Sequence, residues 1–193
     1  MMIPSPLSYT IYDGKPLTNH TAPYSYVLAG NGLFVYAEHR LFSAVTPVSE
    51  VAVRGLPTLK AGVTLKVPKL PRSLLDTIID NARTVRTESG QLLEALYRVR
   101  VENGRYSLSM PDQVATPTSV QTEVKKSVSC LLEIHSHGKM PAFFSPQDDK
   151  DEQGLGLFGV AGKLEGDPTV IFRVSVYGYF MGVSTETLFG ERQ

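Results

Sequence analysis

The sequence of 193 residues has a single cysteine, Cys130, and no excess of either charge. One cysteine cannot form an intramolecular disulfide, so disulfide-stapled secreted scaffolds are excluded and a reducing compartment is expected. The 19 basic and 19 acidic residues give a formal net charge of zero. The chain therefore lacks the basic footprint of proteins that bind nucleic acid or anionic membranes, and we expect neither partner.

Long apolar runs are also missing. No stretch approaches the ~20 apolar residues that a membrane-spanning helix needs. The first ten residues have neither a basic region nor an apolar run, so no signal peptide is predicted. We expect a soluble, cytoplasmic protein with one domain, or with one domain and a small appendage. A chain of this length buries roughly 70% of its unfolded surface without cross-links.

Short strand-like runs, separated by turn residues, fill the first 69 positions. The runs are rich in β-branched and aromatic residues, and Gly, Pro and Asn punctuate them at 30–32 and 55–57. This spacing is typical of a small all-β unit. We predict an N-terminal β-rich subdomain of unknown role over residues 1–69, followed by a second unit over residues 70–193.

The second unit begins with a helix pattern and a hairpin pattern. Apolar residues from Leu74 to Val85 recur on one helical face, and Ser73 is the predicted N-cap. Apolar residues then alternate over 93–101 and again over 106–110. The dipeptide Asn103-Gly104 between them predicts a tight β-hairpin.

Further strands complete the predicted sheet. Alternation over 127–135 predicts one of them. Residues 154–159 spell Gly-x-Gly-x-x-Gly, but a dinucleotide-binding loop needs a strand before it and a helix after it. Here a polar segment precedes the motif and a strand pattern overlaps it, so we predict no nucleotide cofactor and assign the glycines to close strand packing. With strands over 170–176 and 177–183, the fold class is α+β, a mixed sheet flanked by helices.

Two histidines lie at the end of the strand predicted over 127–135. Residues two apart on a strand project from the same face, so the Cβ atoms of His135 and His137 lie about 6–7 Å apart, close enough for one metal ion. Asp148 follows after a short loop and can supply an oxygen ligand, with Asp149 as the alternative. Three protein ligands and an open fourth position are typical of catalytic zinc. The acidic run 149–152 is expected to be a solvated loop.

The spacing His-x-His, seven residues, Ser-x-x-Asp resembles the motif of the JAMM (JAB/MPN) zinc metalloprotease family, in its prokaryotic branch. His135, His137, Ser145 and Asp148 match this motif position for position. One departure is Gly138, where the family often has proline, and it concerns the shape of the loop. The resemblance implies that His135, His137 and Asp148 hold Zn²⁺.

The same family places a catalytic glutamate upstream, after a helix. The resemblance assigns this role to Glu88, in the segment Glu-Ser-Gly-Gln-Leu-Leu over 88–93. Glu94 is a competitor, but it is out of phase with the apolar alternation of its strand and is expected to face the other side. Glu133 shares the phase of the two histidines and is a further alternative for the base.

The resemblance implies an MPN-type fold from about residue 70 to the C-terminus and an amide hydrolase. Glu88 would pass the proton of a zinc-activated water to the leaving amine, and Ser145 would donate to the developing oxyanion. The substrate would be an isopeptide or C-terminal peptide bond of a ubiquitin-like protein or its conjugate. Two alternatives stay open: a non-catalytic MPN scaffold that binds a ubiquitin-like partner, and a zinc hydrolase of small amide conjugates.

The whole chain also resembles a narrower family, the protein A components of prokaryotic PRTRC genetic systems. The segments Gly-Leu-Pro-Thr-Leu over 55–59 and Leu-Pro-Arg-Ser-Leu-Leu over 70–75 carry this resemblance. It implies association with a ubiquitin-like protein and with an adenylating enzyme of the ubiquitin-activating type. The expected partner is therefore a ubiquitin-like protein, bound through its C-terminal tail.

Overall fold

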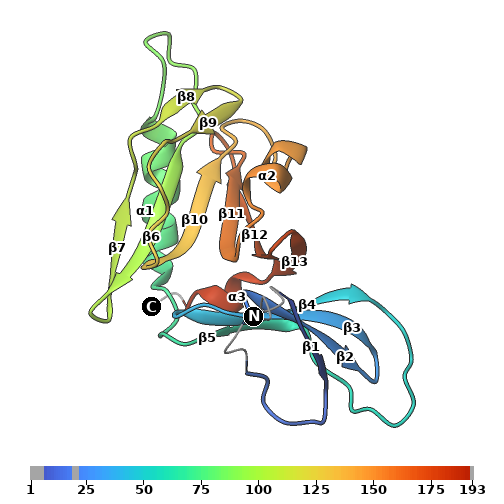
Figure 1. Cartoon of the computed structure of the whole chain (residues 1–193). Helices are drawn as coiled ribbons and strands as arrows, with labels where there is room; N and C mark the ends of the chain where they lie inside the picture. The colour runs from blue at the N-terminus through green and yellow to red at the C-terminus, as the bar shows by residue number, and fades with distance from the viewer. Residues whose placement is uncertain (1–6, 19–21, 192–193) are drawn as a thin grey trace, which may run out of the picture.

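Two β-sheets dominate the computed structural model, which describes residues 7–18 and 22–191 (Figure 1). The first sheet has the strand order β1-β2-β3-β4-β5 and the second has the order β13-β12-β11-β10-β6-β7. The elements in chain order are β1 (Leu7–Ile11), β2 (Tyr24–Ala29), β3 (Gly32–Glu38), β4 (Phe42–Ser49), β5 (Gly62–Leu65), α1 (Arg72–Thr84), β6 (Leu96–Glu102), β7 (Arg105–Ser109), β8 (Val114–Thr116), β9 (Ser119–Gln121), β10 (Cys130–Ser136), α2 (Pro146–Asp151), β11 (Gly156–Gly162), β12 (Thr169–Val176), β13 (Tyr179–Val183) and α3 (Thr185–Leu188). The predicted α+β class, with a β-rich N-terminal part, is confirmed.

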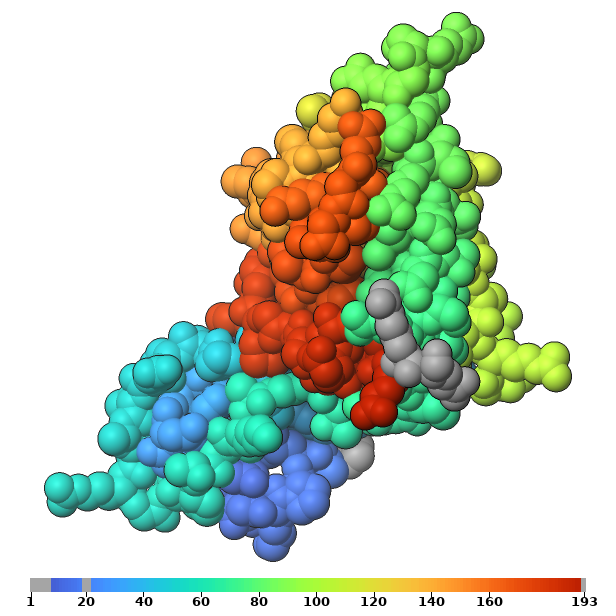
Figure 2. Space-filling view, turned by 180° about the vertical axis from the view of Figure 1, so that it is seen from behind, coloured from blue at the N-terminus to red at the C-terminus, as the bar shows by residue number. Residues whose placement is uncertain are grey.

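The five-stranded sheet contributes its two faces to two different clusters. Val35 and Ala37 of β3 belong to the main core, which also contains α1 and the six-stranded sheet. Phe34, on the other face of the strand, belongs to a smaller cluster with Leu59 from the connection after β4. Figure 2 shows the two sheets as two lobes in contact. Because one core spans both lobes, the N-terminal sheet and the following unit pack as one body.

Helix α1 buries one face in that core. Leu75, Ile78 and Ala82 are its buried residues, as the apolar pattern predicts. Its N-cap is Pro71, which makes no side-chain cap, so the assignment of that position to Ser73 is wrong: Ser73 lies inside the first turn. Among the residues that the structure describes, no helix is long and apolar enough to cross a bilayer.

The strand that carries the histidine pair starts later than the alternation indicates. β10 begins at Cys130, and Val128 is 69% exposed because residues 128–129 form a turn. The strand pairs with β6 in antiparallel and with β11 in parallel fashion. The predicted hairpin is confirmed: β6 and β7 are joined at Asn103 and Gly104, which both have positive φ, as a type I′ turn requires.

The glycine-rich segment continues into β11, where two glycines lie at positions that have no room for a side chain. A Cβ on Gly159 would lie 2.8 Å from the Phe172 ring. A Cβ on Gly162 would lie 2.3 Å from the backbone nitrogen of Ala142. The loop that follows β10 therefore lies directly on β11, and this contact sets where the chain goes after the histidines. Close packing, the role predicted for the glycines of 154–159, is confirmed for Gly156 and Gly159 but not for Gly154, where a Cβ would meet no atom of the described residues within 4 Å.

Candidate metal centre

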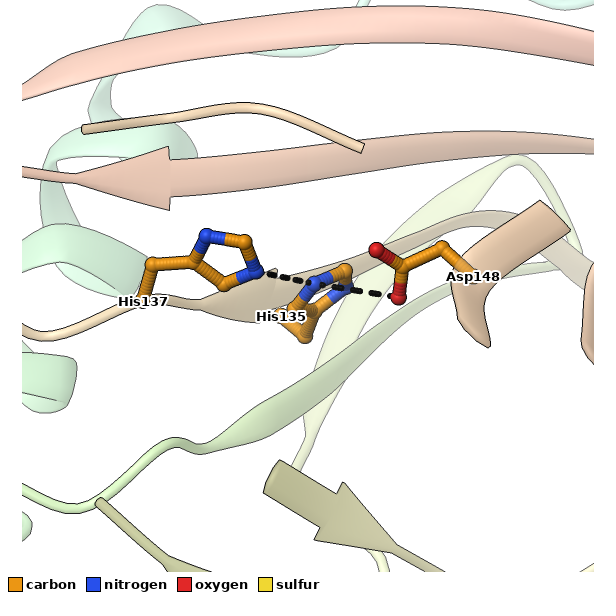
Figure 3. A group of neighbouring side chains, drawn as sticks. All are labelled: His135, His137 and Asp148. Atoms are coloured by element: carbon orange, nitrogen blue, oxygen red, sulfur yellow. Dashed lines mark hydrogen bonds and ion pairs between the residues drawn. The ribbon is translucent and has the colours of Figure 1, made fainter. Parts of the chain in front are cut away.

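His135 and His137 project together from β10 and its extension. His135 lies within β10, and the backbone N–H of His137 donates to the carbonyl of Ala161 in β11 at 2.8 Å, which continues the strand geometry beyond the end of β10. The two Nε2 atoms are 3.1 Å apart (Figure 3). Ile134 immediately precedes His135, points to the opposite face of the strand, and belongs to the main core. The imidazoles therefore occupy the sheet face opposite that core.

Asp148 comes to the histidines from helix α2. Its Oδ1 lies 3.4 Å from Nε2 of His135 (Figure 3). Its Oδ2 accepts the backbone N–H of Ser145 at 2.6 Å, while Oγ of Ser145 accepts the backbone N–H of Asp148 at 3.2 Å. This reciprocal pair is a capping box. One carboxylate oxygen is thus held by the helix start, and the other is turned toward the histidines.

The three side chains fit a zinc ion. Their ligand atoms all lie within 4.8 Å of one another. Burial lowers the pKa of His135 to about 4 and also lowers the pKa of His137, so both imidazoles are neutral at pH 7. Nδ1 of His137 donates to the carbonyl of Pro141 at 3.3 Å, which leaves its Nε2 lone pair for a metal. Two neutral imidazole nitrogens and one carboxylate oxygen are a usual zinc donor set.

An open cavity of about 510 Å³ lies over these ligands. The β8–β9 hairpin supplies part of its wall and is tied to the start of β6. The backbone N–H of Glu94 donates to the carbonyl of Thr116 at 2.9 Å, and that of Leu96 donates to Oε1 of Gln113 at 2.9 Å. The cavity gives a substrate access to the ligands. Its lining includes Glu94, Arg98, Glu133, His135, His137, Met140, Phe143, Ser145, Asp148, Glu152 and residues 118–123.

Glu94 is the upstream glutamate that the fold brings to this cavity. It is 4% exposed and lines the cavity together with both histidines. Leu96 pairs with His135 across β6 and β10, and directly opposite residues of an antiparallel pair project from the same face. Glu94, two residues before Leu96, shares that face. Burial, with a smaller contribution from nearby Asp148, raises the pKa of Glu94 to about 7.

Glu88 lies away from this cavity. It is exposed in a turn, where the backbone N–H of Gly90 donates to the carbonyl of Thr87 at 2.9 Å. It is not among the residues that line the cavity over the ligands. The structure therefore brings Glu94, and not Glu88, together with the histidines. Glu94 does lie off the apolar face, as expected, but the inference that this sets it aside as the base is wrong, because the histidines occupy the same face.

The other two acidic alternatives are engaged by arginines. Oε2 of Glu133 accepts Nε–H of Arg98 at 2.6 Å, and the Arg98 side chain is nearly fully buried. Oδ1 of Asp149 accepts Nη1–H of Arg173 at 2.5 Å. Asp149 is not part of the group that could hold a metal, whereas Asp148 is. Glu133 lines the cavity, but Arg98 engages its Oε2, whereas no such ion pair is shown for Glu94 within the part of the chain that the structure describes.

The run 149–152 is exposed at its first three residues, as its composition indicates, but it is not a loop. Most of it belongs to α2, and Glu152 at the C-cap is 7% exposed. Oε2 of Glu152 lies 2.8 Å from Nε and 2.7 Å from Nη2 of Arg173 in β12. Burial raises the pKa of Glu152 to about 7 despite this arginine. No local pattern points to this pair, because its partners are far apart in the chain.

Comparisons with known proteins bear on the same region. A family model described as prokaryotic homologs of the JAB domain matches residues 77–177, just over half of the chain. The matched range runs from within α1 to the turn between β12 and β13. It contains the two histidines, Asp148, Ser145 and both upstream glutamates. The comparison with curated proteins gives no match.

Proposed function

The chain belongs to the prokaryotic homologs of the JAB domain, and from this premise we propose that it is a zinc-dependent hydrolase of amide bonds. The observation that carries the proposal is the convergence of His135, His137 and Asp148 on one point. A structural zinc site is closed by a fourth protein ligand, whereas a catalytic site keeps one position open. The three ligands here border an open cavity that also contains a buried glutamate.

Glu94 replaces Glu88 as the proposed general base. When bound by His135, His137 and Asp148, zinc would supply a Lewis acid that polarises a water molecule and the substrate carbonyl. The Glu94 carboxylate would take the proton of the attacking water and deliver it to the leaving amine. A pKa raised to about 7 suits a group that must both accept and donate near neutral pH. Such acid–base catalysis contributes about 10²–10⁴-fold.

Ser145 is proposed to stabilise the developing oxyanion. Its Oγ accepts the backbone N–H of Asp148, so the hydroxyl hydrogen is still available to the cavity that Ser145 lines. A donor of this kind is worth on the order of 10²–10³-fold in other enzymes. The same residue thus caps α2 and donates toward the substrate.

We propose that the substrate is an isopeptide or C-terminal peptide bond of a ubiquitin-like protein. Strand β9 pairs only with β8 in the described sheets, and its three residues all line the cavity. An extended tail can add a strand along such an edge and place its last bond over the ligands. The resemblance of the whole chain to PRTRC protein A supports the same partner. The buried free thiol of Cys130 supports a reducing, cytoplasmic location.

Two glutamate variants test the proposal. The zinc-loaded wild type, Glu94→Gln and Glu88→Gln are assayed on a ubiquitin-like–peptide fusion and on a small acyl-amino acid. The wild type and Glu88→Gln should cleave the fusion at rates within twofold of each other. Glu94→Gln should bind one zinc ion per chain and lose about 10²–10⁴-fold in rate, because only the proton carrier is removed.

Each other outcome selects a different assignment. An inactive Glu88→Gln beside an active Glu94→Gln would return the base to Glu88. Cleavage of the small amide alone would identify a zinc hydrolase of small conjugates. A folded wild type without stoichiometric zinc would leave the non-catalytic scaffold that binds a ubiquitin-like partner.

A further inference from the structure

Helix α2 carries Asp148 but has little of its own to hold it in place. It is six residues long and none of them is buried. A helix this short is not stable in water by itself. A metal ligand nevertheless has to be held within about 0.5 Å of its productive position. Contacts from outside the helix must therefore fix where Asp148 lies.

Arg173 supplies polar contacts to two residues that follow that ligand in the chain. It belongs to β12, and the residue is only 6% exposed. Its Nη1–H donates to Oδ1 of Asp149 at 2.5 Å, next to Asp148 in the chain. Its Nε–H donates to Oε2 of Glu152 at 2.8 Å, one helical turn after Asp148. One guanidinium thus binds α2 at two residues, and both of them follow the metal ligand in the chain.

Two aromatic rings complete the surroundings of the guanidinium. Cζ of Arg173 lies 3.9 Å from the centroid of the Phe144 ring and 4.0 Å from that of Phe180. Phe144 immediately precedes Ser145, the N-cap of α2, and Phe180 belongs to β13. The rings restrict the rotation of a planar cation, and Phe144 extends the contact to the N-terminal end of the helix. The Arg173 side chain therefore connects both ends of the segment 144–152 to the sheet.

We propose that Arg173 is a positioning residue of the metal centre, which sets zinc affinity by fixing α2, and with it Asp148, against the sheet. This inference rests on the proposed zinc function. Arg173 makes no hydrogen bond or ion pair with the three ligands, and its charge also acts on His135; its positioning effect passes through the helix. Residues behind the ligands of metal sites typically change metal affinity by about 10–100-fold when they are replaced.

The contacts of Arg173 with Asp149, Glu152 and the two rings depend on the planar guanidinium, which presents several N–H donors in a fixed geometry. We call this set of contacts the Arg173 clamp. Lysine keeps the charge but offers a single ammonium, which cannot donate to Asp149 and Glu152 in the same geometry or stack on a ring in the same way. Arg173→Lys should therefore weaken zinc binding about 10–100-fold without removing any ligand. Arg83→Lys is the matched control, because Arg83 binds the carbonyl of Leu164 at 2.8 Å from α1 and touches no residue of 144–152.

The experiment measures metal binding directly. The dissociation constant for Zn²⁺ is obtained by competition with a chelator, and the visible absorption of the Co²⁺-loaded protein reports the ligand geometry. Thermal unfolding of the metal-free proteins shows whether each variant is folded. Arg173→Lys should show weaker Zn²⁺ binding and an altered Co²⁺ spectrum, whereas Arg83→Lys should match the wild type in both.

Asp149→Asn keeps the test decisive if Arg173→Lys does not fold. The Asp149 side chain is 51% exposed, and the buried Arg173 keeps Glu152 as its charged partner after this change. It should weaken Zn²⁺ binding about tenfold, the lower end of the range for such residues. Affinities within twofold of the wild type in the folded variants, or an equal loss in Arg83→Lys, would overturn the role of Arg173. A wild type that binds no zinc would instead overturn the proposed function.

Discussion

Strand β10 and helix α2 bring the metal ligands together from two differently built supports. β10 lies between β6 and β11 in the six-stranded sheet, and six of its seven residues are buried. Its ladder hydrogen bonds and the main core hold His135 in place. α2 has no buried residue, and polar contacts hold Asp148: the capping box of Ser145 at one end and the clamp of Arg173 beside it.

The difference separates what maintains the fold from what completes the site. Burial in the core stabilises β10 whether or not a metal is present, so the histidine pair is formed in advance. The place of α2 depends on a few directional contacts, each worth about 0.5–3 kcal/mol. Changes on the α2 side should therefore alter zinc binding more than they alter stability, and changes on the sheet side should alter both.

Removing one ligand from each support gives the largest expected effect. His137→Ala and Asp148→Ala should each weaken zinc binding by about a hundredfold to a thousandfold, which is about a quarter of the 10–16 kcal/mol of a four-ligand site. His137 is buried and packs on Phe143 with ring centroids 4.6 Å apart. Its loss should also cost about 1–3 kcal/mol of metal-free stability, whereas Asp148→Ala should cost about 1 kcal/mol, the value of a cap.

Chelator competition and urea unfolding of the two variants provide these numbers. An equal loss of stability in both would contradict the difference between the supports. Global unfolding of either variant at neutral pH would show that the ion is structural.

The pH dependence of stability should show the raised pKa of Glu94, which lies next to β6 on the sheet side of the site. Its pKa is raised from 4.5 to about 7 in the folded protein, so the folded chain holds this proton more tightly than the unfolded chain. The contribution of Glu94 to stability should fall as the pH rises from about 4.5 to about 7, by up to about 3 kcal/mol in the metal-free state. The difference between the wild type and Glu94→Gln isolates this contribution from those of Glu152 and the histidines. Glu94→Gln, which cannot ionise, should be the more stable protein at pH 8 and equal to the wild type near pH 4.

Unfolding by urea at several pH values, with a chelator present, measures this difference. Glu88→Gln is the control and should stay within about 0.5 kcal/mol of the wild type throughout, because Glu88 is exposed. A Glu94→Gln curve parallel to that of the wild type would show that the Glu94 carboxylate is solvated.

Removing the N-cap side chain of α2 or of α3 should have the smallest effect of these changes. Ser145 caps α2 and Ser184 caps α3, and each side chain accepts a backbone N–H three residues later. Ser145→Ala and Ser184→Ala should each cost about 1 kcal/mol of stability. Only Ser145→Ala should also weaken zinc binding, because α3 carries no ligand. Equal zinc affinities in the two variants, measured by chelator competition, would show that the cap does not position Asp148.

Several elements could be predicted from the sequence because their determinants are local. The turn at Asn103 and Gly104 and the apolar face of α1 both depend on residues within a few positions of each other. The pattern does not predict the later start of β10, at Cys130, or the N-cap of α1 at Pro71, because burial and backbone geometry override pattern at the ends of elements. The Ser-x-x-Asp spacing is itself a capping box, so the start of α2 was also open to prediction.

The glutamate next to the ligands illustrates what local patterns leave open. The alternation correctly places Glu94 on the face away from the apolar core, but the inference that this face sets it aside as the base is wrong. Only the register that pairs Leu96 with His135 shows that the histidines occupy this same face. The same holds for Glu152, whose burial depends on Arg173, 21 residues later in the chain.

The sequence by itself determined the α+β class, the shared face of His135 and His137, and the spacing that lets Asp148 return to them. Each follows from the period of a strand or the length of a loop, which neighbouring residues set. The tertiary structure decided which glutamate joins the ligands and what holds α2 in place. Strand register and the pairing of distant buried charges set those two features, and both exist only once the sheet has formed.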